Sequence, residues 1–242
     1  MKLLKSLGIL LMLGLTPSAI QADALSEDRV KELVYEAIRE NPGIVLEAVE
    51  ILRARDAQAQ AQAQSDVLSN QRDILENDPN APVLGNPDGD VTVVEFFDYN
   101  CPYCRRAKPA LLELLEFDPN VRLVYREWPI LGEGSVYAAK AALASRNQGK
   151  YEEFHWAMMS MNGRSEEASV LRVAREIGLD IDKLKADMNS QEIAEHIQTS
   201  MQLAQALGFS GTPSFVIGDN LVPGLVDASQ MIELVGEARA AE

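Results

Sequence analysis

Hydrophobic positions near the start of the chain recur at the spacing of an amphipathic helix. An i, i+3, i+4 stripe is formed by Val30, Leu33, Val34, Ala37 and Ile38. Ser26 is a suitable N-cap for this helix, Asn41-Pro42 interrupts it, and a second apolar helical segment covers residues 44–52. Two short amphipathic helices cannot bury such stripes by themselves. We therefore expect them to pack on the main domain or on another copy of the chain.

The next segment favours a helix but has no stripe of large apolar residues. Residues 57–64 read AQAQAQAQ, and both residue types are good helix formers, so a solvated, semi-rigid spacer is expected. Apolar helical spacing resumes over residues 67–75 and ends at Asp78-Pro79-Asn80-Ala81-Pro82. The expected divisions are an N-terminal helical oligomerisation segment at 23–56, a helical spacer at 57–77 and a main domain at 78–242.

Short β-type runs alternate with helical blocks from residue 83 onward. The runs are Val83–Gly85, Val91–Phe97, Val121–Trp128, Ser214–Ile217 and Leu221-Val222. We expect one helix from Pro102, a block of helices at about 135–207 and a final helix capped by Asp227. This order is that of an α/β thioredoxin fold with a helical insertion, preceded by the N-terminal helical segment.

The composition is that of a globular protein with a sizeable core. Of the 242 residues, 47% are hydrophobic and 24% are charged, and the formal net charge is −15. Such acidity disfavours binding to nucleic acid and docking on anionic lipid. Net charge names no partner, so the function has to be inferred from particular residues.

The first residues have the pattern of a secretory signal peptide. A short basic start at Met1–Lys5 precedes an apolar run at Leu7–Leu15, and small residues end the region. We expect a signal peptide at residues 1–22, with cleavage after Ala22 or Ala24, and an uncleaved anchor is the alternative. The apolar run is short for a transmembrane helix. Export would place the chain where disulfides persist.

The strongest chemical signal is the only pair of cysteines. The run Val91–Phe97 leads through a short loop into Cys101-Pro102-Tyr103-Cys104, and a helical segment follows. A C-x-x-C pair in this position is typical of redox sites, because the N–H groups and positive dipole end of a helix favour a thiolate at Cys101. Pro102 suits the first helical position, and Cys104 falls one turn in, where it is less exposed.

Two other interpretations of the cysteine pair stay open. A structural zinc site needs four ligands, and neither histidine lies near the pair in sequence. A purely structural disulfide would close a loop too short to constrain much of the unfolded chain. Redox chemistry fits the motif and its position best.

Two further places are candidates to support this chemistry. Glu95 stands among apolar residues on the preceding strand. If it is buried there, its pKa rises and it can pass protons to and from Cys104, whereas a surface carboxylate is the alternative. Thr212-Pro213 precedes the strand Ser214–Ile217. Sequence physics alone favours a trans bond, because only about one X–Pro bond in twenty is cis in folded proteins.

The stretches EFFDYNCPYC and GTPSFVIG, with the helical insertion between them, resemble the DsbA family of periplasmic thiol-disulfide oxidoreductases from about residue 83 onward. The resemblance implies that Cys101 is the exposed nucleophile, Cys104 the resolving thiol and Glu95 a buried acid. It also implies that Pro213 is a cis-proline facing the disulfide, and that Thr212 helps to select substrates by backbone contact. Pro102 and Tyr103 complete the active-site motif. Arg126 is expected as a basic partner of Glu95.

The chain departs from DsbA itself in two respects. DsbA has histidine where this chain has Tyr103, and the loss of that imidazole removes a stabiliser of the Cys101 thiolate, so we expect a less oxidising pair. The run EAIRENPGIVLEAVEILRAR is similar instead to the ScsC branch of the family. Some ScsC-type proteins trimerise through such a segment and act as disulfide isomerases.

The resemblance therefore implies a periplasmic disulfide isomerase, a homo-oligomer with a trimer favoured. Its partners would be exported proteins with thiols or disulfides and a membrane redox protein, a reductase for an isomerase or an oxidase for an oxidant. A monomeric DsbA-like dithiol oxidase is the nearest alternative. A periplasmic Cu(I)-binding protein that uses the same thiols, and a module that only captures client proteins, are alternatives of other classes.

The remaining soft or titratable residues receive no role. We expect no cofactor and no dedicated metal site, apart from adventitious or secondary Cu(I) on the reduced cysteines. Met158, Met159 and Met161 have ligand atoms that suit Cu(I), but packing in the insertion accounts for them better. His155 is expected to be partly buried in the insertion, and His196 is expected on a solvated face.

Overall fold

The computed structural model describes residues 26–241, so the signal peptide expected at residues 1–22 and its cleavage positions lie outside the described residues. Contacts divide the chain into two compact units, one that ends at Ala54 and one that starts at Arg55. Within the described range, no helix combines the length and the apolar character needed to cross a membrane.

The first unit contains α1 (Glu27–Glu40) and the beginning of α2 (Gly43–Asn70). The first helix begins where the sequence predicts, because the Ser26 hydroxyl accepts the backbone N–H of Arg29 at 3.3 Å. The two helices are separated at Asn41-Pro42, also as predicted. No residue of α1 is buried. The exposed apolar side chains of the two helices include Val30, Leu33, Val34, Ile44, Leu46, Val49 and Leu52.

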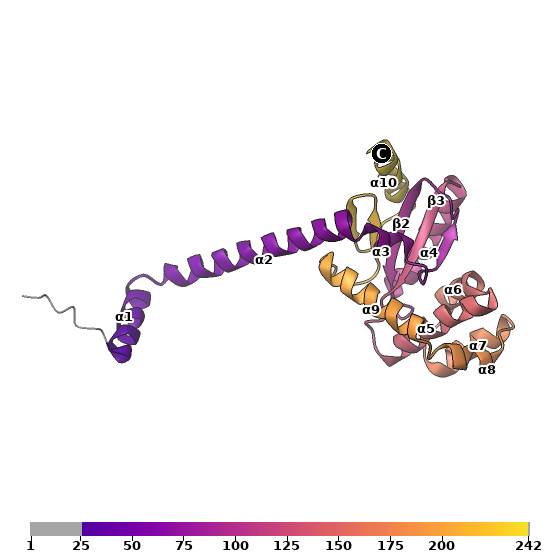
Figure 1. Cartoon of the computed structure of the whole chain (residues 1–242), viewed down its shortest axis with the longest axis horizontal. Coiled ribbons are helices and arrows are strands. Elements are labelled where there is room, and N and C mark those ends of the chain that lie inside the picture. The colour runs from indigo at the N-terminus through magenta and orange to yellow at the C-terminus, as the bar shows by residue number, and fades with distance from the viewer. Residues whose placement is uncertain (1–25, 242) are drawn as a thin grey trace, which may run out of the picture. The chain divides into compact units, whose positions relative to one another are not determined.

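The second unit is built on a five-stranded sheet. Its strands are β1 (Val83–Gly85), β2 (Val91–Phe97), β3 (Val121–Glu127), β4 (Ser214–Ile217) and β5 (Asn220–Pro223). Their order across the sheet is β1-β3-β2-β4-β5, in which β2 and β3 are parallel and the other neighbours are antiparallel. Figure 1 shows β2 and β3 near α4 (Pro102–Phe117), the helix that connects them. The predicted α/β thioredoxin arrangement is confirmed.

Helices cover both faces of this sheet. On one face lie α4 and α10 (Ala228–Ala241). On the other lie α3 (Arg72–Asn77), the end of α2 and α9 (Gln191–Ala206). Successive side chains of a strand point to opposite faces, so Val93 belongs to the core beneath α4 and Val94 to the core beneath α9. Two buried cores result, one on each side of β2.

The helical insertion occupies the chain between β3 and β4, close to the expected bounds of 135–207. Its elements are α5 (Glu133–Ser145), the 3₁₀ helix η1 (Arg146–Gln148), α6 (Tyr151–Ser160), α7 (Glu167–Glu176), α8 (Ile181–Asp187) and α9 (Gln191–Ala206). Contacts run from α5 to each of the other four α-helices of the insertion, and all of its alanines are buried. Small side chains therefore let α5 serve as the centre of the insertion.

The Ala-Gln repeat is helical and lies within the second unit, where two of its glutamines contact the end of α9. The side-chain amide of Gln60 donates to the backbone oxygen of Ala206 at 2.7 Å, and that of Gln64 donates to Leu207 at 2.9 Å. These carbonyls lie at the C-terminal end of α9, where the helix leaves acceptors without partners. A spacer solvated over its whole length was therefore the wrong expectation, because α9 supplies hydrogen-bond acceptors to two of the glutamines.

His196 is buried, which corrects the expectation of a solvated face. Its Nε2 lies 2.8 Å from a carboxylate oxygen of Glu127, and its Nδ1 lies 3.6 Å from Asp78. Burial opposes a charged imidazole, but the hydrogen bonds to Asp78 and Glu127 outweigh it and raise the pKa of His196. The residue therefore ties α9 to the end of β3 and to the segment before β1.

Arg126 is not the partner of Glu95, and this expectation was also wrong. The register of β2 and β3 pairs Glu95 with Tyr125, so the next residue along β3 points to the opposite face of the sheet. There the Arg126 guanidinium donates to a carboxylate oxygen of Asp78 at 2.7 Å and to the backbone oxygen of Leu75 at 3.0 Å. Arg126 anchors α3 to the sheet and has no place in the cysteine site.

Candidate active site

The two cysteines lie at the first turn of α4, directly after the loop that follows β2. Cys101 is the N-cap residue and Pro102 occupies the first helical turn. The backbone N–H of Cys104 points to the Cys101 sulfur at 3.4 Å. Both cysteines are free thiols. The sequence therefore placed the pair correctly, with the first sulfur where the helix offers unpaired N–H groups.

The segment before β4 covers the Cys101 sulfur. The Thr212-Pro213 peptide bond is cis, and the backbone oxygen of Thr212 lies 3.1 Å from Cys101 Sγ. Only 3% of Cys101 is exposed, less than expected of an exposed nucleophile. The reason is that antiparallel pairing of β4 with β2 brings residues 212–213 over the start of α4. Thr212 and Pro213 are thus at the sulfur, as the resemblance implied.

The two sulfurs have opposite acidities. The hydrogen bond from the Cys104 thiol is the largest influence on Cys101. Together with the Thr212 side chain and the N–H groups of Cys104 and Tyr103, it overcomes burial and lowers the pKa of Cys101 to about 6. Burial raises the pKa of Cys104 well above that of an ordinary thiol. At neutral pH, Cys101 is therefore the thiolate and Cys104 the thiol.

Glu95 lies on the same face of the sheet as the cysteines and is almost fully buried. Its carboxyl oxygens make no hydrogen bond with the described residues. Burial, and then the charge of Cys101, raise the pKa of Glu95 to about 8. This pKa is closer to that of a thiol than an ordinary carboxyl's, so a proton passes between Glu95 and Cys104 at a smaller free-energy cost. The charge of Glu95 in turn contributes to the raised pKa of Cys104.

Tyr103, which lies between the cysteines in sequence, faces outward. Its side chain is exposed, and the guanidinium of Arg106 lies 5.5 Å from the centre of its ring. The tyrosine thus provides an aromatic surface beside Cys101 and no side-chain group that stabilises the thiolate. Its backbone N–H does contribute to the lowered pKa of Cys101.

Several residues that support the site were missed from the sequence. His155 is fully buried, and its Nδ1 lies 3.0 Å from the hydroxyl of Tyr99, in the loop before Cys101. Burial, with the charge of Lys108, lowers the pKa of His155 to about 3, so its ring is neutral. Asn100 and Arg105 bind that same loop to the insertion. The only sequence feature that could have pointed to these supporting residues is that polar residues flank the cysteines on both sides.

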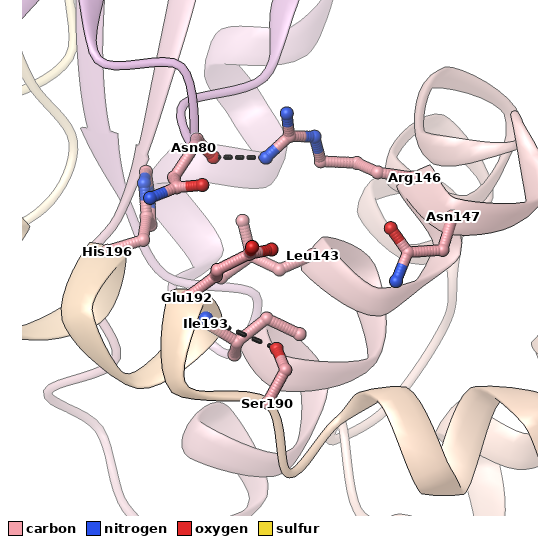
Figure 2. A pocket seen from close by; sticks show the side chains of 8 residues that line it. All are labelled: Asn80, Leu143, Arg146, Asn147, Ser190, Glu192, Ile193 and His196. Atoms are coloured by element: carbon pink, nitrogen blue, oxygen red, sulfur yellow. Dashed lines mark hydrogen bonds between the residues drawn. The ribbon is translucent and has the colours of Figure 1, made fainter.

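A small cavity lies away from the cysteine pair. Figure 2 shows His196 and Asn80 at one side of it and Asn147 at the other, and its volume is about 20 Å³. None of the sequence-predicted site residues lines this cavity. Among the described residues, no three or more His, Cys, Asp or Glu side chains are grouped so as to hold a metal ion. Met158, Met159 and Met161 are packed in the core, and Cu(I) binding stays untested.

Two family patterns match the chain. The DSBA-like thioredoxin domain matches residues 92–236, which is more than half of the sequence. The copper resistance protein ScsC N-terminal domain matches residues 27–59. The two matches correspond to the main domain and to the N-terminal helices, respectively.

Solved structures with substantial sequence identity share this fold. A thioredoxin-like oxidoreductase from Silicibacter pomeroyi DSS-3 is 66% identical, with a TM-score of 0.70 over 71% of this chain and 99% of that one. ScsC from Proteus mirabilis, in a transitional conformation, is 32% identical, with a TM-score of 0.67 over 90% of this chain and 99% of that one. The second comparison includes most of the described N-terminal region.

Curated relatives include much longer proteins. A Na+/H+ antiporter from Salinispora arenicola is 34% identical over 137 residues, which are 56% of this chain and 21% of the antiporter. The chain thus spans about a fifth of the length of that relative. The antiporter's transport activity is a property of that whole protein.

The raised pKa of Glu95 predicts a pH-dependent stability. The folded protein holds a proton on Glu95 up to about pH 8, whereas the unfolded chain loses it near pH 4.5. Wild-type protein is therefore expected to lose stability between these values relative to Glu95→Gln, by roughly 3–5 kcal/mol. The measurement is the free energy of unfolding of both proteins, fully reduced, by denaturant titration at several pH values.

The matched control for this experiment is Glu113→Gln, which removes an exposed carboxylate from α4. Its stability should follow that of the wild type at every pH. A constant difference between wild type and Glu95→Gln from pH 5 to pH 8 would show that Glu95 ionises normally in the folded protein.

Proposed function

Because this chain belongs to the DsbA-like family of thiol-disulfide oxidoreductases, with an N-terminal domain of the ScsC type, we propose that it is a periplasmic disulfide isomerase of exported proteins. The observation that carries the proposal is the contrast between its two sulfurs. Cys101 is held as a thiolate at the start of α4, and Cys104 is held as a buried thiol one turn later. A nucleophile and a resolving group are thereby separated within one helical turn.

The reaction begins with attack of the Cys101 thiolate on a substrate disulfide. A new S–S bond joins Cys101 to one substrate sulfur, and the other substrate sulfur leaves as a thiolate. In isomerisation, a different substrate thiolate then attacks the mixed disulfide and expels Cys101, so no electrons are gained or lost overall. Attack by Cys104 would instead release a substrate reduced by two electrons and leave the protein oxidised. The Cys104 proton then passes to the carboxylate form of Glu95, which is easier to reach once the mixed disulfide has removed the charge of Cys101.

The cis-proline segment supports the capture step. The cis bond before Pro213 and the carbonyl of Thr212 lie directly at the Cys101 sulfur. An extended substrate that reaches this sulfur must pass along the backbone of residues 211–213. Contacts with backbone groups require only that the substrate segment be extended and accessible, and they do not depend on its side chains. Such recognition suits a protein that acts on many exported substrates.

The exposed apolar side chains of the first unit support oligomerisation. Leu46 is 69% exposed, and Val34, Ile51 and Leu52 are each about half exposed. A chain that carries so many apolar residues on two helices gains free energy when another copy covers them. A trimer would bring several Cys101 thiolates to one substrate, and the effective concentration would favour the repeated attack that isomerisation needs. A membrane reductase would keep Cys101 reduced.

A Cys104→Ala variant is expected to accumulate mixed disulfides. Without the resolving sulfur, Cys101 stays bound to substrates that offer no second thiol, so disulfide-linked adducts should appear on non-reducing gels of periplasmic extract. Their protein partners can be identified by mass spectrometry. The matched variant Cys101→Ala should form no such adducts.

Cysteine variants also distinguish thiol-disulfide exchange from the two alternative functions, client capture and copper transport. A module that merely captures clients would retain them after both cysteines are changed to serine. A copper carrier would instead compete with a Cu(I) chelator and would form no adducts through Cys104→Ala. Either result would contradict thiol-disulfide exchange as the function.

The mass of the mature protein in solution tests the oligomeric proposal. Light scattering should give a multiple of the single-chain mass, and deletion of residues 23–54 should give one chain, because it removes the exposed apolar helices and keeps Gln60 and Gln64 on α9. Leu46→Glu should weaken the oligomer, whereas Glu47→Gln, at the next position of α2, should not. The intact oligomer should refold scrambled ribonuclease faster than the deletion variant.

A single-chain mass for the intact mature protein would contradict the oligomeric isomerase. The protein would then act as a monomeric DsbA-like dithiol oxidase, and it would form disulfides in reduced substrates faster than it rearranges wrong ones.

A further inference from the structure

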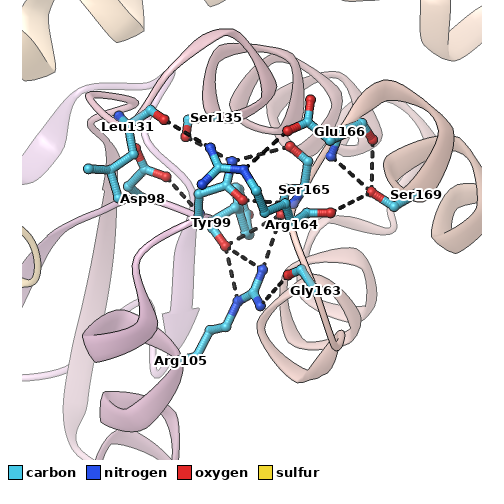
Figure 3. Close-up of polar contacts among 11 residues, drawn as sticks. Asp98, Tyr99, Arg105, Leu131, Ser135, Gly163, Arg164, Ser165, Glu166 and Ser169 are labelled. Carbon is cyan, nitrogen blue, oxygen red and sulfur yellow. Dashed lines mark hydrogen bonds and ion pairs between the residues drawn. The ribbon is translucent and has the colours of Figure 1, made fainter.

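A cluster of polar contacts joins the loop that carries the nucleophile to the helical insertion (Figure 3). The backbone N–H of Ser165 donates to the side-chain oxygen of Asn100 at 2.7 Å, and the Asn100 amide donates back to the Ser165 carbonyl at 3.2 Å. The same amide donates to the hydroxyl of Ser135 at 3.1 Å. Gly134 permits this approach, since a Cβ there would lie 2.1 Å from the Ser165 oxygen.

Arg105, the residue after Cys104, makes a second connection between the same two segments. Its guanidinium donates twice to the backbone oxygen of Tyr99, at 2.8 and 3.1 Å, and with the other arm to the carbonyls of Met161 at 3.0 Å and Gly163 at 2.7 Å. Gly163 has a φ of +85°, a backbone conformation that other residues rarely adopt. Figure 3 shows the guanidinium between the two backbone segments.

Asp98 fixes the loop from its other side. One carboxylate oxygen accepts the backbone N–H of Asn100 at 2.7 Å, and the other accepts that of Leu131 at 2.9 Å. The backbone N–H of Cys101 donates to the Asp98 carbonyl at 2.9 Å. Every residue from 98 to 100 is therefore held by a hydrogen bond directly before the nucleophile.

We infer that Arg105 and Asn100 are positioning residues, which clamp loop 98–100 to the insertion segment 161–165 and thereby hold the Cys101 sulfur at the start of α4. This inference rests on the proposed thiol-disulfide exchange. The sulfur keeps its contacts with the Cys104 N–H and the Thr212 carbonyl only while the preceding loop is fixed. Small displacements of a reacting atom are costly to rate, so the clamp acts on attack by Cys101.

We assign the effect of Arg105 to its geometry more than to its charge, although the charge also interacts with Asp98 and with both cysteines. Each of its acceptors named above is a neutral carbonyl oxygen, and its planar fork reaches two backbone segments at once. A lysine would keep the positive charge, but its single nitrogen cannot span both segments. Arg105→Lys therefore distinguishes the effect of the planar guanidinium from the effect of its positive charge.

The test compares reduced wild-type protein with Arg105→Lys, Arg105→Met, Asn100→Ala and the double variant Asn100→Ala/Arg105→Met. Two quantities are measured on protein shown to be folded by circular dichroism. One is the rate of reaction of Cys101 with dithiodipyridine, and the other is the pH midpoint of thiolate formation by ultraviolet absorbance. Arg172→Lys, an exposed arginine on α7 of the insertion, is the matched control.

Both Arg105 variants and Asn100→Ala are expected to react roughly tenfold more slowly than wild type. Their thiolate midpoints should move up from about 6 toward that of an ordinary cysteine. The double variant should lose little more than the worse single variant, because both residues hold the same segment. Arg172→Lys should match the wild type.

Two results would overturn the inference. If Arg105→Lys matches the wild type and Arg105→Met does not, the charge is what matters. If all the folded variants keep the wild-type rate and midpoint, the contacts serve stability only. A wild-type protein that fails to react with the disulfide at all would instead count against the proposed function, so the two failures are distinguishable.

Discussion

The backbone N–H groups at the start of α4 point toward the sulfur of Cys101, and the Cys104 thiol donates to the same atom. These interactions offset the cost of keeping a charge in a place where only a few per cent of the residue is exposed. Burial also acts on Cys104 and Glu95, where compensating hydrogen bonds are too weak or absent, and it keeps both groups protonated at neutral pH. The Cys101 thiolate, which is the nucleophile, thus lies in the same small region as two protonated groups, Cys104 and Glu95.

The rest of the second unit maintains that arrangement. Strand β2 lies between β3 and β4, so its end delivers the cysteine loop, its interior delivers Glu95, and its pairing with β4 delivers residues 212–213 to the sulfur. The insertion contributes from the other side, through Ser165 and the carbonyls that bind Arg105. The helical insertion is therefore part of the active-site support as well as an addition to the fold.

The sequence predicted the order of elements and the cysteine pair because both depend on local patterns, namely periodicity and a four-residue motif. Contacts between distant segments were less accessible. His196 looks like a solvated residue of a polar helix, because its partners Glu127 and Asp78 are far away in sequence. Arg126 was assigned to the wrong face, because that assignment needs the register of β2 against β3. The burial of Cys101 beneath residues 212–213 likewise depends on the pairing of β4 with β2.

The account depends most directly on the unequal acidity of the two sulfurs. The decisive measurement is the pH dependence of alkylation of the reduced protein by iodoacetamide, with each modified cysteine identified by mass spectrometry. The account predicts that Cys101 reacts with a midpoint near pH 6 and that Cys104 stays unmodified over the same range. Equal reaction of the two cysteines, with a midpoint near that of a free thiol, would contradict it.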